Sequence, residues 1–303
     1  MTFKLQNSVN QQVKLPEELG VELFVKREDT IHPFVSGNKY RKLKYNITEA
    51  QKSGCKTLLT FGGAYSNHIA AVASAGQISG FKTIGVIRGD ELANKIDSNP
   101  TLRYAKQCGM TFKFISRTLY REKTSEEFLN NLKEEFDDFY LVPEGGTNHL
   151  AVKGCEEILT SEDASFNYIC CAVGTGGTIS GLINCSDPSQ EVLGFPALKG
   201  DFLKQDISKF AIKNHWKLIT DYHFGGYAKI NEDLVAFINQ FKNDYNIPLD
   251  PVYTGKMMFG ILDLIEKNYF PKGSRILVIH TGGLQGIDGM NAVLKNKNLP
   301  IIK

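Results

Sequence analysis

The chain has 303 residues, of which 42% are hydrophobic and 22% are charged, so its composition is that of an ordinary globular protein and not of a disordered one. Its net charge is +2, from 35 basic and 33 acidic residues without a long run of one sign, which argues against nucleic acid or an anionic membrane surface as a partner. A chain of this length is expected to form two domains.

The sequence favours a cytoplasmic protein. Residues 1–13 are polar and lack the apolar centre of a signal peptide, and no stretch approaches the ~20 apolar residues of a membrane helix. The six cysteines form no CxxC pair and no disulfide framework, so we interpret them as buried free thiols of a reducing compartment. No cluster of histidine, cysteine and aspartate has the spacing of metal ligands, and we expect no metal.

Strand and helix patterns alternate along almost the whole chain. Strands are predicted at 22–26, 57–61, 83–87, 111–115, 139–142, 167–173, 192–195 and 275–280. Helices are predicted at 39–51, 69–79, 100–108, 125–136, 151–159, 179–183, 231–245 and 261–267. Such alternation is typical of an α/β fold with parallel sheets flanked by helices. Ligands bind at the C-terminal ends of such strands, where glycine clusters fall at 62–63, 145–146, 174–177 and 282–283.

The first candidate site residue is Lys39, in the stretch Ser36 to Leu43, where a small-residue turn precedes a predicted helix. A lysine in this position is most simply a solvated surface charge. Alternatively, it lies in a partly desolvated pocket, where a lowered pKa makes its amine nucleophilic enough to form a Schiff base. The stretch alone does not decide between these interpretations.

The second candidate is the loop Gly174-Thr175-Gly176-Gly177-Thr178, which joins a predicted strand to a predicted helix. Its glycines allow the backbone to approach an anion closely, and the N–H groups at the helix start point toward that anion. A plain turn would not need this composition. Ile179 stands where the dinucleotide fingerprint G-x-G-x-x-G needs glycine, and no lysine follows as in a P-loop. We therefore predict a site for a small phosphate monoester.

Three further segments carry polar groups in loops or turns. Gly62 to His68 brings a hydroxyl, an amide and an imidazole to a helix start, either as a helix cap or to bind a carboxylate or a ring hydroxyl. Tyr253 lies in the turn 250–256, where it either lines a site or simply packs. Thr281 ends a strand beside two glycines, and its hydroxyl needs a partner, either a ring nitrogen or the backbone.

Together these motifs resemble those of the 1-aminocyclopropane-1-carboxylate deaminase/D-cysteine desulfhydrase family, pyridoxal 5'-phosphate enzymes of the tryptophan synthase β-subunit fold. Six motifs follow in the family's order: Lys-Arg-Glu-Asp at 26–29, Ser-Gly-Asn-Lys-Tyr-Arg-Lys-Leu at 36–43, Gly-Gly-Ala-Tyr-Ser-Asn-His at 62–68, Gly-Thr-Gly-Gly-Thr at 174–178, Asp-Pro-Val-Tyr-Thr-Gly-Lys at 250–256 and His-Thr-Gly-Gly at 280–283. The resemblance implies a larger cofactor-binding domain from 1–46 plus 152–303, and a smaller α/β domain at 47–151.

The resemblance also implies which residues bind the cofactor. Lys39 would be the Schiff-base lysine and would shuttle a proton at the substrate α-carbon. Lys42 and the loop Gly174 to Thr178 would hold the phosphate. Asn67 would contact the ring hydroxyl and Thr281 the pyridine nitrogen. A lysine, a phosphate cradle and a partner for the ring nitrogen are the groups that such a cofactor needs.

The substrate would be a small amino acid bound above the cofactor. The catalytic residues beside Lys39 would be Ser66, Tyr227 and Tyr253, and the family's pattern places the following residues against the substrate: Ser66, Asn67, His68, Tyr227, Tyr253 and Thr254. In the deaminases proper a glutamate follows the matching tyrosine, whereas this chain has Thr254, as the D-cysteine desulfhydrases do. Opening a cyclopropane ring should need the stronger electron sink that a carboxylate provides, so D-cysteine-type α,β-elimination is favoured.

Three alternatives stay open on the sequence. One is 1-aminocyclopropane-1-carboxylate deaminase activity, and another is a non-catalytic protein that binds a sugar phosphate or a nucleotide at the Gly174 loop. A nicotinamide dehydrogenase is disfavoured because the fingerprint is missing. The resemblance further implies a homodimer, and neither nucleic acid nor membrane is expected as a partner.

Overall fold

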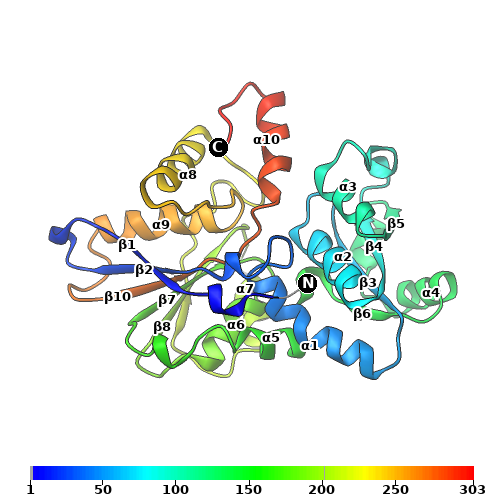
Figure 1. The fold of residues 1–303 in the computed structure, drawn as a ribbon, viewed down its shortest axis with the longest axis horizontal. Coiled ribbons are helices and arrows are strands. Elements are labelled where there is room, and N and C mark those ends of the chain that lie inside the picture. Colours follow the sequence, from blue (N-terminus) through cyan, green and yellow to red (C-terminus); the bar gives the residue numbers. More distant parts are fainter. Residues whose placement is uncertain (1–2, 201) are drawn as a thin grey trace.

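The computed structural model describes residues 3–200 and 202–303, which form two sheets flanked by helices (Figure 1). The larger sheet has the strand order β1-β2-β10-β7-β8-β9, with β1 at Asn10–Val13, β2 at Glu22–Lys26, β10 at Arg275–Ile279, β7 at Tyr168–Val173, β8 at Glu191–Pro196 and β9 at Trp216–Leu218. Every pairing in it is parallel except that of β1 with β2. The α/β class expected from the sequence is confirmed.

The smaller sheet is wholly parallel and comes from the stretch of chain between β2 and β7. Its order is β5-β4-β3-β6, with β5 at Met110–Ile115, β4 at Lys82–Arg88, β3 at Thr57–Gly63 and β6 at Tyr140–Val142. The domain boundaries at 46/47 and 151/152 remain a prediction. Figure 1 shows this sheet on the right, next to α2, α3 and α4.

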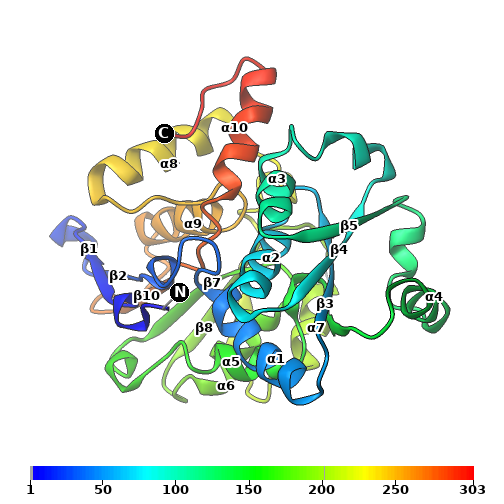
Figure 2. The ribbon, with the colours of Figure 1, turned by 45° about the vertical axis from the view of Figure 1, so that its right-hand side comes forward.

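The helices are α1 at Asn38–Lys52, α2 at Asn67–Ser79, α3 at Pro100–Gln107, α4 at Glu126–Phe136, α5 at His149–Cys155, α6 at Gly177–Cys185, α7 at Phe202–Ser208, α8 at Glu232–Tyr245, α9 at Thr254–Glu266 and α10 at Gly286–Asn296. Helices α8 and α9 lie on one side of the larger sheet and α5 and α6 on the other (Figures 1 and 2). Helix α1 packs on α5 and connects β2 to the smaller sheet. No helix of the described residues is long and apolar enough to cross a membrane.

The larger sheet is buried on both faces, as its alternating side chains show. Cys170 belongs to the apolar core beneath α8 and α9, whereas its neighbour Cys171 belongs to the core beneath α6. Successive residues of a strand point to opposite faces, so a strand between two helical layers is apolar throughout. All six cysteines are free.

Some elements were missed or misplaced by the sequence patterns. Strands β1 and β9 and helices α7 and α10 were not predicted, α5 ends at Cys155 and not at residue 159, and α9 begins at Thr254 and not at residue 261. Glycine lowers helix propensity, but Gly255 and Gly260 of α9 are tightly packed. An added Cβ would lie 2.7 Å from Ile238 at the first and 2.7 Å from Tyr222 at the second. Tertiary packing therefore overrides local propensity in this helix.

Candidate active site

A cavity of about 690 Å³ lies at the C-terminal ends of strands from both sheets, the place where parallel sheets bind ligands. The wall contains twelve of the residues predicted from the sequence: Lys39, Lys42, Ser66, Asn67, His68, Gly174, Thr175, Gly176, Thr178, Tyr227, Tyr253 and Thr281. Two predicted residues, Gly177 and Thr254, are not part of the wall. The motifs that are far apart in the sequence therefore meet at one cavity.

Lys39 lies in the first turn of α1 and faces this cavity, so the structure places it in a pocket and not on the open surface. Its Nζ donates a hydrogen bond to Asn38 Oδ1 at 3.0 Å, and Asn38 Nδ2 donates to Thr178 Oγ1 at 2.9 Å. Desolvation lowers the pKa of Lys39 to about 7, and the like charge of Lys42 adds to this effect. Near neutral pH a large fraction of the amine is therefore unprotonated and nucleophilic.

Lys42 lies one helical turn further along α1 and is 3% exposed. Its Nζ donates to Gly145 O at 2.9 Å and Thr147 Oγ1 at 3.1 Å, and it lies 3.4 Å from Thr175 Oγ1. None of the ion pairs found among residues 3–200 and 202–303 includes this ammonium. A buried cation with only neutral oxygen partners is incomplete, and an anion would complete it.

The loop before α6 provides the second part of this anion cradle. Gly176 has a φ of 81°, a conformation that favours glycine, and the N–H groups of the first turn of α6 follow it. Gly177 does not line the cavity. A Cβ on it would lie 2.7 Å from Thr147 Oγ1, so this glycine allows Thr147 to approach the loop and Lys42. Lys42 and the helix start thus supply positive potential at the same end of the cavity.

Ser66 and Asn67 also line the cavity, at the beginning of α2. Ser66 caps the helix, because its Oγ accepts hydrogen bonds from His68 N at 3.2 Å and Ile69 N at 3.4 Å. Its hydroxyl hydrogen is still available to a ligand, so the capping role and a binding role are compatible. The Asn67 amide lies against the backbone of Gly283, where an added Cβ would be 2.6 Å from Nδ2.

His68 has a neutral, buried ring. Its Nε2 lies 2.8 Å from Thr60 Oγ1, which itself donates to Val142 O at 2.8 Å, so Nε2 carries the proton and Nδ1 is left as an acceptor. Nδ1 is buried and has no hydrogen-bond partner. Desolvation, with Lys39 and Lys42 nearby, holds the pKa of His68 well below its ordinary value. The ring therefore adds no positive charge to the cavity.

Tyr227 and Tyr253 form an aromatic pair in the wall of the cavity. Their ring centroids are 6.3 Å apart with an interplanar angle of 66°. Burial raises the pKa of Tyr253 well above its ordinary value, so its phenol stays protonated and can donate a hydrogen bond. Gly174 accommodates this ring, because a Cβ there would lie 3.1 Å from Tyr253 Cε1.

The direct substrate contact expected of Thr254 requires a correction. Thr254 is fully buried at the start of α9, and its Oγ1 donates to Asp250 Oδ2 at 2.8 Å and accepts from Asp250 N at 2.9 Å. The hydroxyl therefore points into the Asp250 turn and not into the cavity. Asp250 lines the cavity in its place, with Oδ1 accepting from the N–H groups of Val252 and Tyr253 and Oδ2 from both donors of Thr254.

The sequence analysis assigned no role to Asp250, Arg88 or Glu144, all of which line the cavity. Arg88 ends β4, and Glu144 follows β6 next to the glycine pair at 145–146. Their positions at strand ends were the available signal, because cavity residues gather there. Nothing in the sequence showed that Asp250 would turn back to bind its own loop.

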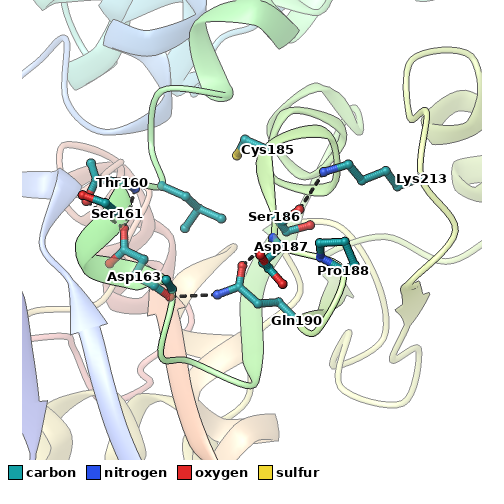
Figure 3. Close-up of a pocket in the computed structure, with 11 residues that line it drawn as sticks. Thr160, Ser161, Asp163, Cys185, Ser186, Asp187, Pro188, Gln190 and Lys213 are labelled. Atoms are coloured by element: carbon teal, nitrogen blue, oxygen red, sulfur yellow. Dashed lines mark hydrogen bonds between the residues drawn. The ribbon is translucent and has the colours of Figure 1, made fainter.

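A second hollow, of about 450 Å³, lies on the surface beside the larger sheet (Figure 3). Polar groups in its wall are hydrogen-bonded to one another. Gln190 Nε2 donates to Asp163 O at 2.8 Å, Gln190 Oε1 accepts from Asp187 N at 2.9 Å, and Lys213 Nζ donates to Ser186 O at 2.6 Å. These contacts fix loops to one another, so we assign the hollow a structural role.

Comparison with known proteins agrees with this geometry. The model of the family described as "Pyridoxal-phosphate dependent enzyme" matches residues 9–282. The chain belongs to this family. A bifunctional D-cysteine desulfhydrase/1-aminocyclopropane-1-carboxylate deaminase of Arabidopsis thaliana is 30% identical over 91% of this chain and 77% of its own. A D-cysteine desulfhydrase of Klebsiella pneumoniae is 29% identical over 89% of each chain.

The crystal structure of a 1-aminocyclopropane-1-carboxylate (ACC) deaminase homologue is similar to the whole fold. It has a TM-score of 0.78 and 28% sequence identity, and the match covers 95% of this chain and 94% of that one. These similarities confirm the family resemblance, the pyridoxal-phosphate cofactor and the enzyme class predicted from the six motifs.

The residues in the cavity fit a pyridoxal-phosphate group. The ammonium of Lys42, which has no acidic partner, lies beside the Gly174 loop and suits a phosphate, and Lys39 offers an amine whose pKa is lowered to about 7. Thr281 lies at the end of β10 and lines the cavity, where its hydroxyl suits a ring nitrogen. Among the described residues no group of acidic, histidine or cysteine side chains could hold a metal ion.

Replacing Lys42 by methionine is expected to weaken pyridoxal-phosphate binding about 10- to 100-fold, since a hydrogen bond to a charged group contributes about 1.5–3 kcal/mol. Binding of pyridoxal, which lacks the phosphate, should change little. Titration of the apo-protein with both compounds measures the difference. Equal losses for the two compounds would show that Lys42 does not act on the phosphate.

The rate at which the apo-protein captures pyridoxal should rise with pH and level off above a midpoint near pH 7. The pKa of Lys39 is lowered from 10.5 to about 7, and only the deprotonated amine attacks an aldehyde, so capture is slow below this pKa and fast above it. Lys42→Met should move the midpoint upward, because the Lys42 charge contributes to lowering the pKa. Stopped-flow absorbance from pH 6 to 10 tests this, and a midpoint near 10 in the wild type would contradict it.

Proposed function

We propose that this enzyme catalyses α,β-elimination of D-cysteine or a similar β-substituted amino acid to pyruvate, ammonia and sulfide. The names of the relatives from Arabidopsis and Klebsiella support this class of substrate. When bound, pyridoxal phosphate supplies the electron sink for charge that develops at the substrate α-carbon. The chain's own residues bind the substrate, orient it and move the proton.

The observation that carries the choice of reaction is the Thr254–Asp250 pair. Thr254 follows the tyrosine where the deaminases have a glutamate, and the carboxylate of this motif is Asp250, three residues before Tyr253. Its two oxygens already accept four hydrogen bonds, which is the capacity of a carboxylate. It has no free lone pair to accept a hydrogen bond from a protonated pyridine nitrogen. The Thr281 hydroxyl would instead donate a hydrogen bond to that nitrogen, and it favours a protonated ring less than a carboxylate would. Such a site suits elimination, where a good leaving group departs.

We assign the following roles to the residues of the cavity. The neutral form of the Lys39 amine removes the proton from the substrate α-carbon, and the Ser66 hydroxyl binds the substrate carboxylate near the start of α2. The Asn67 amide would contact the ring hydroxyl of the cofactor and border the substrate. The protonated phenol of Tyr253 would donate to the departing sulfur, and the packing of Tyr227 near its ring supports this role. Water then hydrolyses the eliminated product to pyruvate and ammonia.

The decisive assay offers D-cysteine, L-cysteine and 1-aminocyclopropane-1-carboxylate to the purified holoenzyme. We expect pyruvate and sulfide in equal amounts from D-cysteine, with little 2-oxobutyrate from the cyclopropane compound. The reverse pattern would establish 1-aminocyclopropane-1-carboxylate deamination, the second candidate, which the name of the Arabidopsis relative also supports. No product from any amino acid would overturn both.

We also propose that the enzyme is a cytoplasmic homodimer. Six free cysteines, three of them fully buried, are consistent with a reducing compartment. Light scattering of the purified protein tests the dimer, and fractionation of cells tests the compartment.

A further inference from the structure

The loop that carries Tyr227 has a strained backbone. Four of its residues have positive φ angles: Phe224 at 52°, Gly225 at 90°, Gly226 at 121° and Ala228 at 55°. Two of these four are not glycine, and residues with a Cβ rarely adopt such angles. A strained loop persists only where the surrounding structure holds it in place. The contacts of this loop therefore indicate what fixes the position of Tyr227.

One face of α9 provides these contacts. Residues 256, 259, 260 and 263 follow the spacing of a single helix face. The ring of Phe259 packs edge-on against Phe224 with centroids 5.0 Å apart, and Asp263 accepts a hydrogen bond from the Tyr222 hydroxyl. The absence of a side chain at Gly260 allows the Tyr222 ring to lie directly on the helix. The same helix begins next to Tyr253, so α9 connects both members of the tyrosine pair.

Lys256 is the polar centre of this face. It is 2% exposed, and its Nζ donates to His223 O at 2.9 Å and to Gly226 O at 2.8 Å. These two carbonyl groups also accept the N–H groups of Gly226 and Lys229, so the ammonium joins two consecutive turns of the loop. Burial lowers the pKa of Lys256 to about 8, and it is therefore mostly protonated at neutral pH.

We propose that Lys256 is a positioning residue that holds the strained 223–228 loop and thereby places the Tyr227 hydroxyl against Tyr253 and the substrate. Lys256 itself does not line the cavity, so it acts through Tyr227 and not on the reacting atoms. Its ammonium suits this role because a buried side chain donates to both carbonyl groups at once, and a hydrogen bond from a charged donor is stronger than one from a neutral donor. This inference rests on the proposed amino-acid reaction for its kinetic readout.

The test compares Lys256→Met with Lys229→Met, which removes an exposed ammonium from the same loop. Lys256→Met should lower kcat/KM for D-cysteine about 10- to 100-fold, because small displacements of a positioned group have effects of this size. It should leave pyridoxal-phosphate binding unchanged and should speed amide hydrogen exchange of Gly226 and Lys229 at least about tenfold. Lys229→Met should match the wild type in all three. If Lys256→Met does not fold, Lys256→Gln, which keeps a shorter donor, is measured in the same way.

A double-mutant cycle with Tyr227→Phe separates positioning from general stability. In that background the hydroxyl is already absent, so Lys256→Met should lower kcat/KM less than about threefold further. An equal loss in both backgrounds, or unchanged hydrogen exchange in Lys256→Met, would overturn the inference. A wild type that makes no product would instead count against the proposed function, whereas the exchange measurement on the loop would still stand.

Discussion

Replacing Lys39 by alanine is expected to lower turnover of D-cysteine about 1,000-fold or more and to remove the visible absorbance of lysine-linked pyridoxal phosphate. Lys39 combines the covalent hold on the cofactor with proton transfer at the substrate α-carbon, and positioned acid–base groups alone contribute about 100- to 10,000-fold. Pyruvate release and absorbance spectra of the purified variant measure both effects. Because Lys42 and the Gly174 loop remain, the variant should still bind pyridoxal phosphate, but reversibly.

The matched control is Lys52→Ala, which removes an exposed lysine at the other end of α1. It should have wild-type absorbance and activity, and without cofactor both variants should unfold at nearly the same temperature as the wild-type apo-protein. A Lys39→Ala protein with normal turnover would show that another amine binds the cofactor covalently and transfers the proton. Lys256 is another buried lysine with a lowered pKa, but its ammonium is bound to two carbonyl groups away from the cavity.

The part of the site that could be predicted from the sequence is the part that follows strand ends. The loops after β3, β7 and β10 each carry glycines beside hydroxyl or amide groups, and parallel topology brings such loops to the same edge. Lys39 was ambiguous alone, because a lysine near a helix start is usually solvated. The order of the other motifs favoured the interpretation of Lys39 as a Schiff-base lysine, and the structure places Lys39 in the cavity beside those motifs.

The part that could not be predicted depends on contacts between distant segments. Thr254 was expected to face the substrate, but its hydroxyl is bound by Asp250 four residues earlier, and no sequence pattern fixes which way a turn residue points. Helix α9 was predicted too short because two glycines weaken its local signal. Lys256 donates hydrogen bonds to carbonyl groups some 30 residues earlier. Every residue has a backbone carbonyl, so the sequence does not indicate which carbonyl a side chain will contact.

Arg41 is another such residue, because its sequence position between Lys39 and Lys42 gave it no role. Its guanidinium forms a bidentate ion pair with Glu28, with Nε to Oε2 at 2.8 Å and Nη2 to Oε1 at 2.7 Å. Glu28 is fully buried, and Arg41 is 6% exposed. The pair fastens α1 to the segment after β2, and so sets the position of the helix that carries both site lysines.

Glu28→Leu is expected to lower the free energy of unfolding by about 3–5 kcal/mol, because it removes the bidentate partner of the buried Arg41 guanidinium and leaves only the more distant Glu157, whose Oε2 lies 3.8 Å from Nη1. The double variant Glu28→Leu with Arg41→Met should recover much of this loss, since an apolar pair of similar size needs no charge compensation. Asp97→Asn, which breaks the exposed ion pair with Lys106, is the matched control and should change stability by less than about 1 kcal/mol. Urea unfolding of the apo-proteins gives the three values. If the double variant were as unstable as Glu28→Leu alone, lost packing and not the unpaired charge would be the cause.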